Sequence, residues 1–273
     1  MATSLVTSRA NPRVKQLRAA FAGQPRLAEG LVAIEGEHLL YEAVRSNLPL
    51  KAIFVREGQH LPNWLPANVP RVELSGDVFA SAVNTQAPQG LAALLEPPKW
   101  TLQDAYGKRD TSLLLIVAGL QDPGNLGTLI RSAEAFDATG VLTTAGTVSE
   151  WNQKALRASA GSVFRVPVVH VTPSDLSSLR SRGMRVLAAV AEQATNSSRA
   201  LEVLTASEAD LTVPCALMIG NEGAGISDDW LRLADALVTI PMPGPVESLN
   251  AAVAGSLLLY EAARQRSAKP QMR

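Results

Sequence analysis

Cysteine and histidine are scarce in this chain of 273 residues, which contains one cysteine, Cys215, and three histidines. A lone cysteine excludes an internal disulfide and a cysteine-based zinc site, and it is typical of proteins in the reducing cytoplasm. Its place in an apolar run predicts a buried core residue rather than a nucleophile. No apolar run reaches the roughly 18 residues of a membrane helix, and the first residues lack the apolar centre of a signal peptide. We therefore expect a cytoplasmic protein with no membrane segment.

The net charge is zero, from 25 basic and 25 acidic residues, but the charges are unevenly distributed. Five basic residues and no acid occur in the first 26 residues, and four basic residues and no acid follow Glu261. Basic ends on a neutral body can hold phosphate groups. A solvated helix face gives the same pattern, so the charges alone leave both interpretations open.

Apolar and helical patterns alternate along the chain and divide it into two α/β parts. Residues 31–95 alternate short apolar strands with amphipathic segments, and the proline-containing stretch that follows is the strongest linker signal. From residue 113 onward, fully apolar strands alternate with helices, which is the pattern of a parallel sheet covered on both faces. We predict an amino-terminal domain over residues 1–105 and a second domain, with a mostly parallel sheet, over residues 106–273.

Three loops of the second domain each follow a predicted strand. They cover residues 119–127, 220–227 and 240–250, and we call them the first, second and third loops. Open α/β sheets bind ligands at the carboxyl ends of their strands, and glycines let the backbone approach a ligand closely. The third loop has three prolines and a glycine within five positions, so its backbone is neither helix nor central strand. We predict that these loops form the functional site.

The polar side chains of these loops, and of the helix after the first, limit the chemistry of the site. They are Asn125, Arg131, Glu222, Glu247, Ser248 and Asn250. None is a histidine, which argues against a catalytic triad or a histidine-based metal site. Neither the dinucleotide fingerprint nor the Walker A motif follows a predicted strand. These polar side chains can orient a hydroxyl group and hold a phosphate without a metal. The alternative interpretation of the second domain is a nucleotide- or NAD-dependent enzyme on an ordinary doubly wound sheet.

Three motifs occupy the loops in order along the chain. They are Asn125-x-Gly127-x-x-x-Arg131, Gly220-Asn221-Glu222-Gly223-x-Gly225 and Ile240-Pro241-Met242-x-Gly244-x-x-x-Ser248-Leu249-Asn250. They resemble the signature motifs of the SpoU (TrmH-like) RNA 2′-O-ribose methyltransferases of the SPOUT superfamily. Residues 157–162 also resemble this family. The first domain is similar to the family's RNA-binding module through residues 32–36 and the Gln89-Gly90 turn, although Pro88 stands where members commonly have histidine.

The resemblance implies a C-terminal trefoil knot, a homodimer and the methylation of a ribose 2′-hydroxyl of RNA by S-adenosyl-L-methionine, without a metal. The implied cofactor-binding residues are Gly220, Ile240, Met242 and Leu249. The implied catalytic residues are Arg131, Asn125, Glu222, Ser248 and Asn250. Under this interpretation the phosphate contacts are Arg9, Arg13, Lys15 and Arg18. Arg131 of one subunit is expected to face the cofactor of the other.

Several alternatives stay open at this level. Ribosomal RNA is favoured over transfer RNA because of the additional amino-terminal domain, by analogy alone, and a non-catalytic RNA-binding protein of the same fold is a second candidate. A guanidinium is hard to deprotonate, so we expect Arg131 to grip a phosphate and stabilise an alkoxide rather than act as a base. Glu222 is expected to brace Arg131 or its loop. A purely structural interpretation makes Asn125 and Ser248 the caps of their helices.

Overall fold

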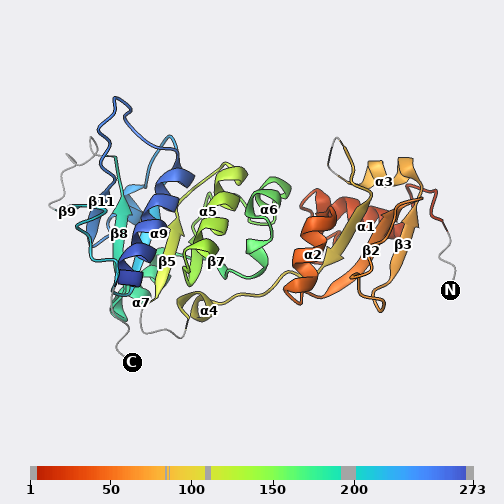
Figure 1. Cartoon of the computed structure of the whole chain (residues 1–273), viewed down its shortest axis with the longest axis horizontal. Coiled ribbons are helices and arrows are strands. Elements are labelled where there is room, and N and C mark those ends of the chain that lie inside the picture. The colour runs from red at the N-terminus through yellow and green to blue at the C-terminus, as the bar shows by residue number, and fades with distance from the viewer. Residues whose placement is uncertain (1–4, 84, 86, 108–111, 192–200, 269–273) are drawn as a thin grey trace. The chain divides into compact units, whose positions relative to one another are not determined.

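The computed structural model describes residues 5–83, 85, 87–107, 112–191 and 201–268 (Figure 1). These residues form two compact units. The first contains Met1–Lys99 and Trp151–Arg165, and the second contains Trp100–Glu150 and Val166–Arg273. Within the described ranges, no helix is both long and apolar enough to cross a membrane.

The first unit is built on a four-stranded sheet in the order β1-β4-β2-β3. Its strands are β1 (Val32–Glu35), β2 (Leu50–Arg56), β3 (Arg71–Leu74) and β4 (Leu91–Leu95). Its first helices are α1 (Pro12–Phe21), α2 (Glu37–Arg45) and α3 (Gly76–Ala82). Helix α1 begins where the Asn11 side chain accepts a hydrogen bond from the Arg13 amide at 2.9 Å, with Pro12 at the first helical position. Its buried Val14 and Leu17 join Phe54 and Phe79 in one core.

A later segment of the chain, Trp151–Arg165, completes the first unit. It contains α6 (Gln153–Ser159) and the 3₁₀ turn η1 (Ser162–Phe164). Gln153 donates from Nε2 to the Ala33 carbonyl oxygen at 2.8 Å, and Arg165 donates from Nη1 to Oε2 of the buried Glu42 at 2.6 Å. The stretch at 157–162 thus belongs to the first unit by its contacts. The chain passes between the units at three points, whereas the limits predicted from the sequence place a single boundary.

The second unit contains a seven-stranded sheet in the order β7-β6-β5-β10-β8-β11-β9, and every pair of neighbours is parallel. The strands are β5 (Leu113–Val117), β6 (Gly140–Thr143), β7 (Val168–His170), β8 (Arg185–Ala189), β9 (Val203–Thr205), β10 (Cys215–Ile219) and β11 (Ala236–Thr239). All residues of the central strands β5 and β10 are buried, which explains their uninterrupted apolar runs. The predicted mostly parallel α/β fold is confirmed.

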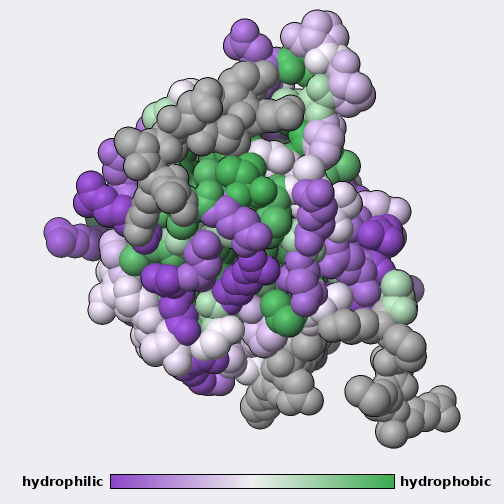
Figure 2. Space-filling model, turned by 90° about the vertical axis from the view of Figure 1, so that its left-hand side faces the viewer, coloured by the Kyte–Doolittle hydropathy of each residue, from purple (hydrophilic) through white to green (hydrophobic). Residues whose placement is uncertain are grey.

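Helices cover this sheet. They are α4 (Leu102–Tyr106), α5 (Pro123–Ala135), α7 (Pro173–Ser181), α8 (Asp228–Leu231) and α9 (Ala251–Ala268). Helices α5 and α9 pack side by side (Figure 1). Helices α4 and α7 contribute to a core with alternate residues of β5 and β10, such as Leu114 and Met218. Figure 2 shows one end of this unit, where a hydrophobic area lies among hydrophilic side chains.

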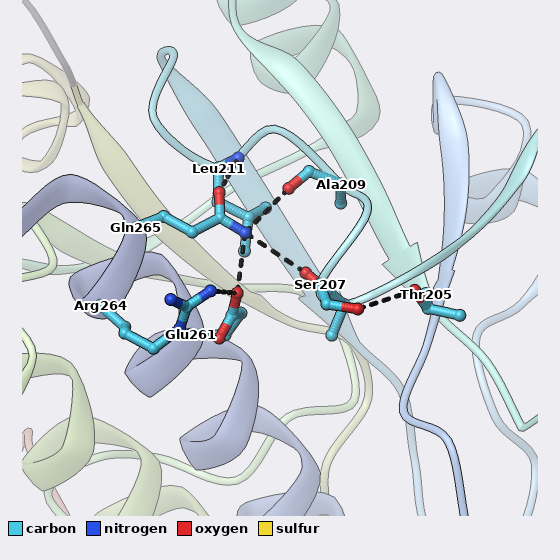
Figure 3. A network of polar contacts seen from close by, with 8 residues as sticks. Thr205, Ser207, Ala209, Leu211, Glu261, Arg264 and Gln265 are labelled. Atoms are coloured by element: carbon cyan, nitrogen blue, oxygen red, sulfur yellow. Dashed lines mark hydrogen bonds and ion pairs between the residues drawn. The ribbon is translucent and has the colours of Figure 1, made fainter. Parts of the chain in front are cut away.

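The carboxyl end of α9 is anchored by buried and half-buried polar groups (Figure 3). Gln265 accepts from the Leu211 amide at 3.0 Å and donates to the Ala209 carbonyl at 3.1 Å. Arg266 donates from Nε to the Leu211 carbonyl at 2.8 Å and lies 3.7 Å from the sulfur of Cys215. Cys215 is buried, as expected, and this burial raises the pKa of its thiol. The bonds of Gln265 and Arg266 hold the carboxyl end of α9 against the segment that leads into β10.

Candidate active site

The three loops leave strands that lie close together in the sheet. The first follows β5, the second follows β10, and the third follows β11. Strands β5 and β10 are neighbours, and only β8 separates β10 from β11. Because all these strands are parallel, their carboxyl ends meet at one edge of the sheet. Segments that are far apart in sequence, such as those of Asn125 and Glu222, which are separated by 97 residues, therefore converge there.

A cavity of about 460 Å³ lies between the second and third loops. All four residues predicted to bind the cofactor line it, namely Gly220, Ile240, Met242 and Leu249. Glu222 and Ser248 line it as well. Ligand cavities commonly range from roughly 300 to 1,000 Å³, so this one has the size of a small-molecule site.

The second loop is folded tightly on itself. Asn221 and Gly225 exchange backbone hydrogen bonds of 2.9 and 3.0 Å, which closes a small hairpin. A Cβ atom on Gly220 would lie 2.4 Å from the carbonyl carbon of Gly225, so no side chain fits at position 220. Asn221 also donates from Nδ2 to the Gly119 carbonyl at 3.0 Å. The hairpin is thus tied to the first loop.

A chain of hydrogen bonds between side chains joins all three loops. Asn125 donates from Nδ2 to Oε1 of Glu222 at 2.6 Å, and Asn250 donates from Nδ2 to Oδ1 of Asn125 at 3.2 Å. One polar residue from each loop therefore takes part. These bonds are exposed, and each stabilises the arrangement by only about 1 kcal/mol. Their main effect is to set the positions of the loops.

The helix caps differ from the purely structural interpretation of Asn125 and Ser248. Asp122 caps α5 by accepting from the Asn125 amide at 2.9 Å, so Asn125 lies inside the helix and its side chain is free to reach Glu222. Asn250 caps α9 by accepting from the Ala252 amide at 2.9 Å. Ser248 precedes this cap, is exposed and lines the cavity. Neither Asn125 nor Ser248 is therefore a helix cap, so the purely structural interpretation does not hold for either side chain.

Arg131 differs from the other predicted catalytic residues. It lies on α5, its side chain is exposed, and it does not line the cavity of its own chain. Within the described part of the chain we find no hydrogen bond or ion pair to its guanidinium. Glu222 bonds to Asn125, so it braces the first loop rather than Arg131.

Part of the cavity wall comes from residues that sequence reasoning missed. Ala189, Val190 and Ala191, at the end of β8, line it. These three residues are apolar, and none is a glycine or a proline, so their own sequence does not mark a site. Their role follows from the position of β8 between β10 and β11, which the order of elements along the chain does not reveal.

The four predicted phosphate contacts all belong to the first unit. Arg9, Arg13 and Lys15 are exposed. Arg18 is half-buried, and it donates from Nε to the Ser81 carbonyl at 3.1 Å and from Nη2 to Oγ of Ser81 at 3.2 Å. Arg18 therefore also fastens α1 to α3. Across the residues that the structure describes, no group of three or more His, Cys, Asp or Glu side chains could hold a metal ion.

Comparison with known proteins assigns both parts of the chain. Residues 112–260 match the model of the SpoU rRNA Methylase family. Residues 11–93 match the model of the MRM3-like substrate binding domain. The two matched segments correspond to the larger part of the second unit and of the first.

Relatives and solved structures agree with these matches. The 23S rRNA (guanosine(2553)-2′-O)-methyltransferase RlmP of Bacillus subtilis is 34% identical over 256 residues, which cover 93% of this chain and 97% of that protein. The 23S rRNA (uridine(2479)-2′-O)-methyltransferase of Streptomyces viridochromogenes is 30% identical over 269 residues, which cover 96% and 92%. The crystal structure of the SpoU methyltransferase AviRb from the same organism, in complex with AdoMet, superimposes with a TM-score of 0.82 and 28% identity over 94% of this chain and 99% of that one.

The resemblance inferred from the three motifs is confirmed by these comparisons. The family model covers more than half of the chain, and two relatives that are at least 30% identical extend over nearly all of it. The chain therefore belongs to the SpoU rRNA methylase family.

Proposed function

We propose that this protein transfers the methyl group of S-adenosylmethionine to a ribose 2′-hydroxyl of ribosomal RNA. The observation that carries the proposal is the convergence of the three loops, joined by Asn125, Glu222 and Asn250, at one cavity. Family membership supports the chemistry, and relatives named as 23S rRNA 2′-O-methyltransferases support the substrate.

The cavity suits S-adenosylmethionine. Its walls include the apolar Ile219, Leu237 and Val238, together with backbone at Gly220 where a Cβ has no room. Apolar walls with a few placed polar groups are typical of cofactor sites. The prolines of the third loop stiffen one wall before a ligand binds, which lowers the entropy cost of binding. A related structure that contains AdoMet superimposes on this fold, which supports the same occupant here.

The reaction is an in-line displacement at the methyl carbon. S-adenosylmethionine supplies an electrophilic methyl group on a sulfonium; the ribose oxygen forms the new bond to carbon while the bond from carbon to sulfur breaks. The hydroxyl proton leaves to a phosphate or to water. Asn125, Ser248 and Asn250 position the ribose, and Glu222 holds Asn125. Correct alignment of the reacting atoms lowers the activation free energy by several kcal/mol. The largest contribution known for alignment is about 7–11 kcal/mol.

Arg131 completes the site from a second subunit of a homodimer in this proposal. Its guanidinium grips the phosphate beside the target ribose and stabilises the developing alkoxide charge. The exposure of Arg131, away from the cavity of its own chain, supports this arrangement. A residue that acted within its own subunit would be expected to line that cavity.

The surface of α9 supports the homodimer. Val253, Leu257 and Tyr260 are 48%, 42% and 52% exposed, and their spacing of four and three residues places them on one side of the helix. Exposed apolar side chains aligned along one helix face are suited to burial against another protein surface. We propose that this stripe contacts the second copy of the chain.

The first unit binds the RNA in this proposal, through the exposed Arg9, Arg13 and Lys15 and the half-buried Arg18. Its match to a substrate binding domain supports that role. We propose a division of labour between residues 1–105 and 106–273, with the second part catalytic and threaded as a trefoil knot. The path of the chain from β11 across β8 to α9, which packs on β10 and α5, is compatible with such threading. We place the reaction in the cytoplasm.

The RNA target is tested by mapping ribose methylation in cells with and without the gene. The proposal predicts the loss of 2′-O-methylation at a site in ribosomal RNA, with transfer RNA unchanged. Loss in transfer RNA alone would contradict the substrate assignment but keep the chemistry. An unchanged methylation map in both RNAs would favour a non-catalytic RNA-binding protein.

A further inference from the structure

The first unit contains a second, larger cavity of about 1,060 Å³, formed entirely by residues of that unit. One wall is the exposed side of α1, and the opposite wall is the segment that follows it, through Leu31. Lys51 of β2 and residues at the end of β4 close it. We name this cavity the α1 cleft.

The α1 cleft is basic. Four cationic side chains line it, from Arg13, Lys15, Arg18 and Lys51, against two carboxylates, from Glu29 and Glu96. Nζ of Lys51 lies 3.0 Å from Oε1 of Glu96, and this ion pair balances the charges of the two side chains.

The three other cationic side chains of the cleft differ in the hydrogen bonds and ion pairs that they make. The Arg18 guanidinium is held by Ser81. Arg13 and Lys15 are exposed and make no ion pair with any residue that the structure describes. These two exposed cations are the ones that a ligand reaches most readily, while Arg18 keeps its positive charge beside the uncharged Ser81. An anion of the phosphate type is the matching partner.

The cleft also has an apolar surface. Leu27 lines it and is 68% exposed, and Leu31, Ala22 and Leu94 line it as well. A large apolar side chain that stays open to solvent beside cationic groups suits a ligand with both an apolar face and a negative charge.

The wall that carries Leu27 is folded without a ligand. The Ala28 amide donates to the Gln24 carbonyl at 3.0 Å, and the Gly30 amide donates to the Pro25 carbonyl at 2.8 Å. Ala28 is fully buried and anchors this turn to the core. Leu27 is therefore presented at a fixed place, and a ligand does not have to order it.

We propose that the α1 cleft binds an unpaired stretch of the RNA substrate, with phosphates on Arg13 and Lys15 and a nucleobase against Leu27. The inference rests on the proposed RNA substrate and names the form in which it is recognised. In a duplex the bases are stacked and paired, so a protein reaches phosphates, sugars and base edges but not the faces of the bases, whereas an unpaired base can enter a cleft and lay its face against side chains. Since the size of the cleft is at the upper end for ligand sites, it admits more than the base alone.

The test is fluorescence anisotropy of a labelled short single-stranded RNA of mixed sequence, and of the same strand annealed to its complement. Leu27→Ser should weaken single-strand binding about fivefold to tenfold, as expected for the loss of most of an apolar contact, with duplex binding unchanged. Leu5→Ser is the matched control, because Leu5 is also exposed but lies outside the cleft. Thermal unfolding verifies that each variant is folded.

The phosphate contact is tested by the salt dependence of binding. Arg13→Gln should reduce the slope of log affinity against log salt by about 0.7, the value for one phosphate on a single strand. Arg26→Gln is the control, since Arg26 is an exposed arginine of the same basic segment that does not line the cleft. It should leave the slope unchanged.

The outcomes separate this inference from the function on which it rests. Equal losses for single strand and duplex in Leu27→Ser, or wild-type affinity for both, would overturn the base site. An unchanged salt slope in Arg13→Gln would overturn the phosphate contact. A wild-type protein that binds neither RNA would instead contradict the proposed RNA substrate itself.

Discussion

Replacement of Gly220 by alanine tests whether the second loop forms the wall of the cofactor site. The added Cβ would lie 2.4 Å from the Gly225 carbonyl carbon, 2.6 Å from its oxygen and 2.6 Å from the Ile226 nitrogen. All three neighbours are backbone atoms, so no side-chain rotation relieves the clash. The hairpin that Asn221 and Gly225 close must therefore open or shift.

The size of the effect follows from the cost of overpacking, which is about 1–3 kcal/mol. If the loop shifts and must return to hold the cofactor, this cost appears as a loss of S-adenosylmethionine affinity of about 5- to 150-fold. Isothermal calorimetry measures that affinity, and thermal unfolding reports the stability of the whole protein. We expect Gly220→Ala to change the affinity for S-adenosylmethionine more than it changes the stability of the whole protein, because the loop lies at the surface.

Gly223→Ala is the matched control for Gly220→Ala. It lies in the same loop, and its added Cβ would meet only Oδ1 of Asn221, at the ordinary contact distance of 3.6 Å. This variant should bind S-adenosylmethionine nearly as the wild type does. Wild-type affinity in Gly220→Ala would refute the assignment of this wall. Because Gly223 also lines the cavity, equal losses in both variants would instead refute the backbone clash at Gly220 as the cause of the loss.

Four further predictions follow from the site and its surroundings. Asn125→Ala removes the two side-chain bonds that link Asn125 to Glu222 and Asn250, so turnover should fall about thirtyfold, from about 1 kcal/mol for each bond, while the protein remains folded in thermal unfolding. Arg131→Lys keeps the charge but loses the bidentate geometry, so turnover should fall at least about tenfold with RNA affinity unchanged; near-full turnover would refute that role. Leu257→Asp should dissociate the proposed homodimer in analytical ultracentrifugation and abolish activity; a wild-type protein that is monomeric would contradict the dimer, and a variant that stays dimeric would exclude the α9 stripe as the interface. Burial raises the pKa of the Cys215 thiol above its unfolded value of 9.0. The buried thiol therefore makes its full contribution to the free energy of unfolding below pH 9.0, and this contribution is lost as the pH rises through the folded pKa. Denaturant unfolding above pH 9.0 should show a smaller loss of stability in Cys215→Ala than in the wild type.

The sheet of the second unit was predictable from the sequence because its central strands are buried on both faces. β5 and β10 read as continuous apolar runs, and the loops after them are marked by glycines and polar residues. The strand order was not predictable. β8 enters between β10 and β11, and nothing in its own sequence indicates those neighbours. The cavity wall at Ala189 was therefore missed.

Several local details required coordinates for similar reasons. Asp122 and Asn125 are both suitable helix caps by residue type, and only the geometry shows that Asp122 takes this role and leaves Asn125 to bond with Glu222. Arg18 belongs to the basic segment that is predicted to contact phosphates, but its guanidinium also donates to Ser81, 63 residues away. Long-range partners of this kind have no local signature in the sequence.

Identification of the atom that receives the methyl group shows directly whether this protein is a ribose 2′-O-methyltransferase. Purified protein is incubated with ribosomal RNA and methyl-labelled S-adenosylmethionine, and the RNA is digested to nucleosides that are separated by mass spectrometry. We expect label in one 2′-O-methylnucleoside, with one S-adenosylhomocysteine formed for each methyl group transferred. Label on a nucleobase, or no transfer by a protein that binds both S-adenosylmethionine and the RNA, would contradict this function.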